Sequence, residues 1–233
     1  MYYLRATLLI LAVCLWPSAL KAELFGIPST PGMTPEGLRL IVDAETSGEA
    51  YYNRWPHPEW PQGQSGVTQG IGYDNGYTAR NLILSDWRNI VGVERLAATA
   101  GITGERARAA AHEVRDVLVP WREALNVFQS VDAPRYYQMC RRIFPGFDDL
   151  APLCRDALVS LIYNRGSSMA GPGRIEMREI ARLTSRKDYR GIALQIRAMK
   201  RLWQNAGLDG LLARREAEAR LVEQCSQHKG NRE

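Results

Sequence analysis

The chain has 233 residues, of which 45% are hydrophobic and 24% charged, and its 30 Lys and Arg against 25 Asp and Glu give a formal charge of +5. This composition is that of an ordinary globular protein, and it excludes a wholly disordered chain, a collagen-like chain and a multi-span membrane protein. The length suits one or two domains, and four cysteines are too few for a disulfide-dense miniprotein.

The first 22 residues have the pattern of a secretory signal peptide. Arg5 precedes an apolar run of about a dozen residues, and small residues follow up to Ala22. The run is shorter than the roughly 20 residues that a membrane-spanning helix needs. We therefore predict that residues 1–22 are removed on export, and that residues 23–233 form one domain of a periplasmic or secreted protein without stable membrane insertion. An alternative is a signal-anchor endolysin, which keeps the apolar segment in the membrane until a later release.

Cleavage after Ala22 would remove Arg5 and Lys21, leaving 28 basic against 25 acidic residues and a formal charge of +3. The remaining chain is mildly basic and has no dense basic run, so nucleic acid is not an expected partner. The cysteines and histidines have no metal-ligand spacing, so we expect no metal and no cofactor.

Export would place three cysteines in an oxidising compartment, where disulfides persist. Cys140 and Cys154 flank residues 144–147, a turn between two helical patterns. A bridge between them would close a loop of about 15 residues and stabilise the fold by roughly 3 kcal/mol. We predict this bridge, with Cys225 left over, and the alternative is three free thiols.

The N-terminal third combines a helix, a long loop and a short β segment. Thr34 and Pro35 suit an N-cap and a first helical residue, and apolar residues at 3–4 spacing carry this helix to Glu45. Residues 51–66 are rich in proline and glycine and predict a loop of about 15 residues, a length typical of functional or mobile loops. Residues 67–74 are β-prone and interrupted by glycine, and they predict the strands of a small sheet.

From Leu82 onward the pattern is helical almost to the end of the chain. The fold class that we predict is α+β, mostly α, with a small β-hairpin or sheet near the N-terminal third and a helical bundle. The predicted helices are one capped by Ser85 and Asp86 that carries Trp87 and Ile90, 104–118, one from Pro120, one from Pro134 that ends before Pro145, 148–165, 175–185, 188–205 and 208–227.

Three polar side chains around the β segment could carry chemistry. Glu45 lies at the apolar edge of its helix, and apolar surroundings raise the pKa of a carboxylic acid, which suits a general acid. Asp74 precedes a turn signal, where we expect it to be solvated and ionised. Two carboxyls in such different environments are what glycoside hydrolysis uses, and Thr68 could hold the attacking water.

Two other acidic residues, Glu49 and Asp43, compete with Glu45 for the role of the acid. On a continuous helix Glu49 would share a face with Glu45, whereas Asp43 would point elsewhere. Composition and spacing leave open whether any of these carboxylates is catalytic or an ordinary surface or capping residue.

Residues 44–52 and 60–77 resemble the active-site region of phage-type lysozymes, and they are most similar to the pesticin-like branch of muramidases. In that superfamily a Glu at a helix end precedes a hairpin with the pattern Thr-x-Gly-x-Gly-Tyr/His, and in the pesticin-like branch an Asp follows the Gly-Tyr pair. Here residues 68–74 read Thr-Gln-Gly-Ile-Gly-Tyr-Asp. Residues 157–167 resemble the family's buried central helix ending in Asn-Arg-Gly, and residues 210–219 resemble its closing Gly-Leu-x-x-Arg-Arg-x-x-Glu helix.

The resemblance implies a lysozyme-like domain and an exported muramidase. Its partner would be the glycan strands of peptidoglycan, in which it would cleave the β-1,4 bond between N-acetylmuramic acid and N-acetylglucosamine. Glu45 would be the general acid, Asp74 would activate the attacking water, and Thr68 would position that water. We expect net inversion at the anomeric carbon, because a water held between the two carboxyls needs room.

Three further residues are candidates for contact with the glycan, namely Tyr73, Asn164 and Arg165. Tyr73 suits the core equally well, and Arg165 could instead pair with Glu45 or complement the dipole at its helix end. Four charged residues of the closing segment are expected to form a solvated or structural ion-pair face: Arg214, Arg215, Glu216 and Glu218.

Two positions depart from the family pattern. The familiar phage enzymes have their second carboxylate nine residues after the Glu, where this chain has Arg54, so the role falls to Asp74 or is absent. Gln69 replaces an apolar residue between Thr and Gly, which puts the local strand packing in doubt. Two alternatives therefore stay open: a peptidoglycan-binding protein without turnover, and a lytic transglycosylase that would need only Glu45.

Overall fold

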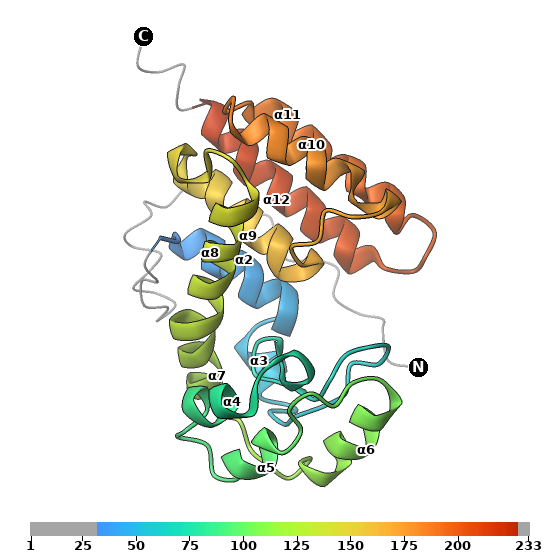
Figure 1. Cartoon of the computed structure of the whole chain (residues 1–233). Helices are drawn as coiled ribbons and strands as arrows, with labels where there is room; N and C mark the ends of the chain where they lie inside the picture. The colour runs from blue at the N-terminus through green and yellow to red at the C-terminus, as the bar shows by residue number, and fades with distance from the viewer. Residues whose placement is uncertain (1–31, 228–233) are drawn as a thin grey trace.

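The computed structural model describes residues 32–227 and shows a mostly helical protein with one small antiparallel sheet. The predicted fold class, α+β and mostly α, is therefore confirmed. The predicted signal segment, residues 1–22, lies outside the described residues. In Figure 1 the helices that follow residue 150 pack at one end of the molecule, and the shorter helices between residues 49 and 127 form the other end. Helix α2 (Pro35–Thr46) lies between them, and helix α8 (Ala133–Ile143) runs along one side.

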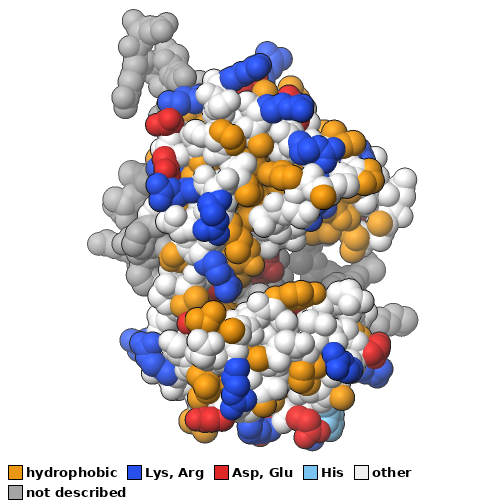
Figure 2. Space-filling model, viewed as in Figure 1, with side chains coloured by type: hydrophobic (Ala, Val, Ile, Leu, Met, Phe, Trp, Pro, Cys, Tyr) orange, Lys and Arg blue, Asp and Glu red, His pale blue; other side chains and the backbone are white. Residues whose placement is uncertain are grey.

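The surface is hollowed between these two ends. Figure 2 shows this hollow in the same view as Figure 1, with acidic and hydrophobic side chains inside it. Behind the surface, a continuous cluster of buried side chains extends from Met33 to Cys225. Within residues 32–227, no helix has the length and apolar character that crossing a membrane requires.

The elements of the described part follow in this order, with a long loop over residues 53–67 between the first short helix and the hairpin. The strands are β1 (Thr68–Gln69) and β2 (Tyr73–Asp74). After α2 the α-helices are α3 (Glu49–Tyr52), α4 (Arg80–Asp86), α5 (Val93–Ala97), α6 (Glu105–Glu113), α7 (Trp121–Val127), α8 (Ala133–Ile143), α9 (Pro152–Arg165), α10 (Ile175–Thr184), α11 (Tyr189–Ala198) and α12 (Asp209–Gln227). Shorter helical turns are η1 (Asn75–Tyr77), η2 (Phe128–Asp132), η3 (Phe147–Asp149), η4 (Pro172–Arg174) and η5 (Met199–Leu202).

Helix α2 begins where the sequence predicts. The Thr34 hydroxyl accepts a hydrogen bond from the Gly37 amide at 3.2 Å, and Pro35 occupies the first turn. The helix ends because Ser47 adopts a left-handed conformation, with φ of 56°. This stop leaves Glu45 in the last helical turn.

The hairpin formed by β1 and β2 pairs Thr68 with Asp74 and Gln69 with Tyr73. Because directly opposed residues share a face of a sheet, the two pairs lie on opposite faces. Gln69 and Tyr73 are buried, at 2% and 1% exposure, whereas Thr68 and Asp74 are half-buried. The small sheet predicted for residues 67–74 is therefore confirmed, with one face in the core and one toward its margin.

The boundaries predicted for the helix capped by Ser85 and Asp86 are wrong. Ser85 and Asp86 end helix α4 instead of capping a later one, and Trp87 is buried in the irregular connection that follows. The Asp86 carboxylate accepts a hydrogen bond from the Tyr73 hydroxyl at 2.7 Å. A tertiary contact thus uses the side chain that local sequence assigned to a helix cap.

The helix predicted from Pro134 is continuous with the helix before it. Proline has no amide hydrogen, and its ring crowds the carbonyl four residues earlier. The chain accommodates Pro134 through the π-helical turn η2, after which the Ala133 amide bonds to the Phe128 carbonyl five residues back. The segment ends before Pro145, as predicted.

The C-terminal helices agree with the sequence more closely. Segments 175–185 and 208–227 correspond to α10 and α12, and segment 188–205 contains α11 and the turn η5. Segment 148–165 begins in the turn η3 and continues as α9. Helix α12 packs along both α9 and α11, so it joins the centre of the molecule to its outer helices.

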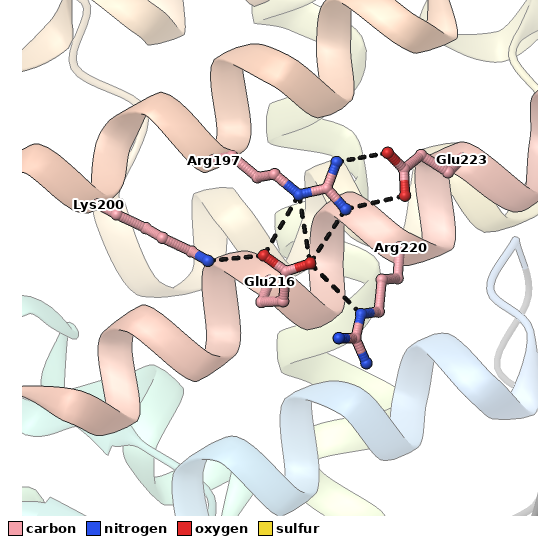
Figure 3. Close-up of polar contacts among 5 residues, drawn as sticks. All are labelled: Arg197, Lys200, Glu216, Arg220 and Glu223. Carbon is pink, nitrogen blue, oxygen red and sulfur yellow. Dashed lines mark hydrogen bonds and ion pairs between the residues drawn. The ribbon is translucent and has the colours of Figure 1, made fainter.

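Ion pairs fasten α11 and η5 to α12 (Figure 3). The Glu216 carboxylate accepts hydrogen bonds from Lys200 at 2.6 Å, from Arg197 at 3.0 Å and from Arg220 at 3.3 Å. Arg197 also donates to Glu223. Glu216 keeps 28% of its side chain exposed, so this network is in contact with solvent and each pair contributes modestly.

Candidate active site

Glu45 lies where three elements far apart in the sequence meet. Its Oε1 accepts a hydrogen bond from Nη1 of Arg214, on α12, at 2.5 Å. Its Oε2 faces the turn of the hairpin, where a Cβ added to Gly72 would lie 3.5 Å from it. The Glu45 side chain keeps 23% of its surface exposed, so its carboxylate is held in place and remains open to solvent.

Arg214 is fixed from behind by α9 and by its own helix. Its Nη2 donates to the Ser160 carbonyl at 3.1 Å, and its Nε lies 3.3 Å from the Ser160 hydroxyl and 3.4 Å from the Glu218 carboxylate. Glu218 in turn accepts from Ser160 at 2.6 Å and from Arg215 at 2.7 Å. The guanidinium of Arg214 therefore presents only its remaining nitrogen to Glu45.

The structure separates the two alternatives for the charged residues of the closing segment. Glu216 belongs to the solvent-contacting network, whereas Arg214, Arg215 and Glu218 are buried, at 6%, 0% and 0% exposure. Helical spacing explains the division, because Arg215 and Glu218 lie on the same face as the buried Val222. Arg214 and Glu218 both contact Ser160 of α9, so this part of the predicted ion-pair face is structural, whereas Glu216 is in contact with solvent.

Tyr163 holds the hairpin turn beside Glu45. Its hydroxyl donates to the Ile71 carbonyl, and a Cβ on Gly72 would lie 3.2 Å from that hydroxyl oxygen. Burial raises the pKa of Tyr163 well above its usual value, and the negative charges of Asp132 and Glu45 add to the effect. The hydroxyl thus stays protonated and remains a donor to the hairpin.

Thr68 and Asp74 lie opposite each other on one face of the hairpin. Asp74 accepts hydrogen bonds from the Gly66 amide at 3.0 Å and the Gly76 amide at 2.8 Å. Burial raises the pKa of Asp74, while these two amides act in the opposite direction. Asp74 is therefore less solvated than the sequence predicts, because it is half-buried and its carboxylate also binds amides at both ends of the hairpin.

Tyr73 lies in the core, and its hydroxyl bonds to Asp86. Its ring packs edge-on against Trp87, with 5.3 Å between ring centroids. With 1% of the residue exposed, Tyr73 offers no open ring face for stacking on a sugar. Its predicted contact with the glycan therefore does not fit its position, and the core alternative does.

Arg165 and Asn164 lie in the last turn of α9. The Arg165 guanidinium stacks over the ring of Trp203 at 4.9 Å and donates to the Gly173 carbonyl at 2.6 Å. Burial, followed by the charge of Arg174, lowers its pKa to about 10. Arg165 does not pair with Glu45, because Arg214 occupies that position. Asn164, the residue after Tyr163, is half-buried.

Glu49 does not share a helical face with Glu45. Helix α2 ends before it, and Glu49 begins the separate short helix α3, where it is exposed. The predicted loop at residues 51–66 is shortened at its start, because α3 extends to Tyr52. Of these two carboxylates, Glu45 alone meets both α12 and the hairpin.

The unusual Gln69 of the hairpin has a polar partner in the core. Its Nε2 donates to the side-chain Oδ1 of Asn75 at 2.9 Å. The Nδ2 of Asn75 donates to the Thr99 hydroxyl at 2.9 Å and to the Leu96 backbone carbonyl at 3.3 Å. Gln69 and Asn75 are both buried. The departure from an apolar residue is thus matched by a second polar residue, and the hairpin remains packed.

A second acidic side chain, Asp132, lies in the π turn η2. It is 2% exposed and pairs with Arg135. Burial raises its pKa to about 7, opposed by Arg135 and reinforced by Asp86. The pKa of Tyr136 is raised by burial, then by the charge of Asp132, and also by the charges of Glu45 and Asp74. The ring of Tyr136 contacts both Tyr163, beside the candidate site, and Arg135 of this buried pair.

Sequence reasoning missed Tyr163 and Arg214 as neighbours of Glu45. Both fall inside the segments that resemble the lysozyme family, 157–167 and 210–219, so the signal was present in the motifs. Among the described residues, no group of three or more His, Cys, Asp or Glu side chains is arranged to hold a metal ion. No protein-family model matches the chain, and no curated protein matches it significantly.

Proposed function

We propose that the protein is an exported muramidase, which cleaves the β-1,4 bond between N-acetylmuramic acid and N-acetylglucosamine in peptidoglycan. The observation that carries the proposal is the setting of Glu45. A partly exposed carboxylate ends a helix, with one oxygen on a buried arginine and the other against a glycine-rich hairpin turn. This is a fixed acid beside a surface that can admit a polymer chain.

Glu45 serves as the general acid in this proposal. Its free Oε2 faces Gly72, an exposed residue without a side chain, so a sugar ring can approach the carboxyl over the hairpin turn. When the proton passes to the glycosidic oxygen, Arg214 stabilises the carboxylate that remains. The buried contacts of Arg214 keep its guanidinium in place, which favours transfer in one geometry.

Asp74 and Thr68 supply the water in this proposal. They share one face of the hairpin, which supports a water held between a carboxylate and a hydroxyl. Asp74 Oδ1 accepts from both hairpin amides, while Oδ2 has a single amide contact at 3.2 Å and keeps acceptor capacity. Attack by this water would invert the anomeric carbon, so α-anomeric sugars are the expected first product.

The bonds between Asp74 and the hairpin amides favour a second candidate, a lytic transglycosylase. If Asp74 only fastens the hairpin, Glu45 is the sole catalytic carboxyl. The 6-hydroxyl of the muramic acid residue would then attack in place of water and give an anhydro-sugar.

Mass analysis of peptidoglycan digested by the purified protein tests the proposal. A muramidase adds water and releases fragments with reducing muramic acid ends, whereas a transglycosylase releases anhydro-muramic ends. The Glu45→Gln variant should lose product formation by roughly 100-fold or more, since it cannot donate the proton. Glu49→Gln is the matched control, because Glu49 is exposed on α3 and should be dispensable.

Three results would contradict a muramidase. Anhydro products would establish the transglycosylase instead. Sedimentation with peptidoglycan but no released fragments would establish a binding protein. Equal activity in Glu45→Gln and the parent would remove Glu45 from the acid role.

A further inference from the structure

Glu59, in the long loop before the hairpin, pairs with β1 on the side away from β2. Its backbone amide donates to the Thr68 carbonyl at 2.9 Å, and the Thr68 amide donates to the Glu59 carbonyl at 2.8 Å. Across the hairpin, Thr68 is also opposite Asp74. Thr68 is therefore the middle residue of a row that runs from Glu59 through Thr68 to Asp74.

The three side chains of this row lie on one face of the sheet. Directly opposed residues of antiparallel strands share a face, so Glu59 has the same face as Thr68 and Asp74. Burial agrees with this assignment. Glu59 is exposed, whereas its neighbours Pro58 and Trp60 are buried and packed against the core, respectively. The residues on either side of Thr68 are likewise buried.

The register sets how close these side chains lie. Both backbone hydrogen bonds of Thr68 go to Glu59, so this is a hydrogen-bonded pair, for which the Cα atoms are about 5.5 Å apart. The pair of Thr68 and Asp74 is then of the other kind, with Cα atoms about 4.5 Å apart and closer side chains. One water on the Thr68 hydroxyl can therefore bridge to a carboxylate on each side.

The two carboxylates of the row differ in their contacts. Asp74 is half-buried and accepts hydrogen bonds from the Gly66 and Gly76 amides. Glu59 is exposed, and its carboxylate has no hydrogen bond or ion pair with any residue in the range 32–227. All of its acceptor positions are therefore available to water.

We propose that Glu59 is a further residue of the water site and orients the water that Asp74 activates. This inference rests on the proposed muramidase function. The water donates one hydrogen to Asp74 and the other to Glu59, and it accepts a hydrogen bond from Thr68. The Thr68 hydroxyl is available for this, because its contact with the Gly66 carbonyl, at 3.4 Å, is too long for a strong bond. The remaining lone pair of the water then faces the anomeric carbon.

Glu59 takes no proton in this scheme. The bond from the water oxygen to the anomeric carbon forms while the glycosidic C–O bond breaks. Glu45 gives its proton to the leaving oxygen, and one proton of the water passes to Asp74. Glu59 stays ionised and keeps its hydrogen bond to the attacking oxygen, so it fixes the direction of attack.

The kinetics of Glu59→Gln on purified peptidoglycan test the proposal. The backbone of Glu59 makes the bonds to Thr68, so the variant should keep the Tm of the parent. We expect kcat to fall by roughly 10-fold at an unchanged KM, since the lost contact is to the attacking water and not to the glycan. Glu49→Gln is the control, because Glu49 is also exposed but lies on α3, and it should keep both constants.

A double variant separates this role from a general effect of charge. In Thr68→Val the water has lost its central contact, so adding Glu59→Gln should lower the residual kcat by less than about 2-fold. A charge that acts independently of the water would cost the same factor in both backgrounds. That result, or a parental kcat in Glu59→Gln, would overturn the proposal.

The Glu45→Gln variant shows which of the two proposals fails. If Glu45→Gln is inactive while Glu59→Gln is fully active, the muramidase stands and Glu59 has no part in it. If Glu45→Gln keeps the parental activity, or if the parent releases only anhydro products, the muramidase is rejected and the role of Glu59 with it.

Discussion

Glu45 and Arg214 are 169 positions apart in the sequence, yet their side chains form a hydrogen bond of 2.5 Å between the last turn of α2 and the buried face of α12. The arginine side chain is 4% exposed and the glutamate 23%. The pair therefore joins the interior of the C-terminal helices to a solvent-facing carboxyl, so packing of α12 decides where the candidate acid lies.

Replacing Arg214 by Met should lower both stability and hydrolysis. The substitution leaves Glu218 with one cation fewer and Glu45 without its partner, and breaking a buried pair costs about 3–5 kcal/mol. Arg214→Lys should recover part of the stability, but lysine cannot reproduce the fork that contacts Ser160 and Glu45 together. Thermal unfolding and release of peptidoglycan fragments measure the two effects.

Arg220→Met is the control for that change. Arg220 lies on the same helix with 69% of its side chain exposed and pairs only at the surface with Glu216. We expect the free energy of unfolding of this variant to stay within about 0.5 kcal/mol of the parent's, and its activity to stay near that of the parent. Equal losses in the two variants would show that the buried network has no special role.

The Gly72→Ala variant should impair activity more than its backbone strain explains. Gly72 has φ of +76°, and a Cβ there would approach Tyr163 at 3.2 Å and Glu45 at 3.5 Å. We expect hydrolysis to fall by about 10-fold or more, because a small displacement of a reacting group is costly. Gly63→Ala provides the comparison, since Gly63 has φ of +63° and no described heavy atom within 4 Å of its added Cβ.

Both glycine variants should lose stability to a similar extent, about 1 kcal/mol, because alanine rarely adopts a positive φ. Only Gly72→Ala should lose activity as well. If both variants retained full activity, the close approach between the hairpin turn and Glu45 would be unimportant for the reaction.

Local sequence signals were reliable where local physics decides the structure. Thr34 and Pro35 marked the start of α2, because a cap and a fixed φ act within one turn. The β-prone residues 67–74, interrupted by glycine, likewise predicted the hairpin. Pro134 was misleading, because a π turn can accommodate a proline that would otherwise end a helix.

The candidate site could be predicted only in part. Motifs selected Glu45, but nothing local to it indicates that Arg214 is its partner, because that contact depends on how α12 packs across α9. Tyr73 illustrates the same limit, because its sequence does not show which way its ring faces. An aromatic residue in a hairpin can face solvent or core, and here the hydrogen bond to Asp86 accompanies its burial.

If Asp74 is the base, activity should fall on the acid side of the pH profile. A base acts only when ionised, and burial raises the pKa of Asp74 above its ordinary value of 3.8. The acidic limb of the rate should therefore lie above that value. Asp74→Asn should lower hydrolysis by roughly 100-fold or more while keeping most of the hairpin bonds, because the amide oxygen still accepts from Gly66 and Gly76.

Variants of Thr68 distinguish a catalytic role of Asp74 from a purely structural one. Thr68→Val removes the hydroxyl and should lower hydrolysis, whereas Thr68→Ser keeps the hydroxyl and should preserve most of it. If Asp74→Asn lowered Tm but left the rate and the products unchanged, Asp74 would stabilise the hairpin and have no part in catalysis.

The buried Asp132 should make the protein less stable at alkaline than at mildly acidic pH. Its pKa in the folded protein is about 7, above the ordinary value of 3.8, so between these values the folded state binds the proton more tightly than the unfolded state. Stability from this group is therefore lost as the pH rises through 7. Asp132→Asn, which is neutral throughout, should raise Tm at pH 8 by several degrees and change it less at pH 5.

Asp116→Asn is the matched control for that prediction. Asp116 has 67% of its side chain exposed, and its bond to Arg95 lowers its pKa to about 2, so it stays ionised in both states from pH 5 to 8. Its replacement should shift Tm equally at the two pH values.

Asp156, whose pKa burial also raises to about 7, should keep part of the pH dependence in Asp132→Asn. An unchanged difference between pH 5 and pH 8 in Asp132→Asn would show that Asp132 is ionised throughout, with Arg135 compensating its charge.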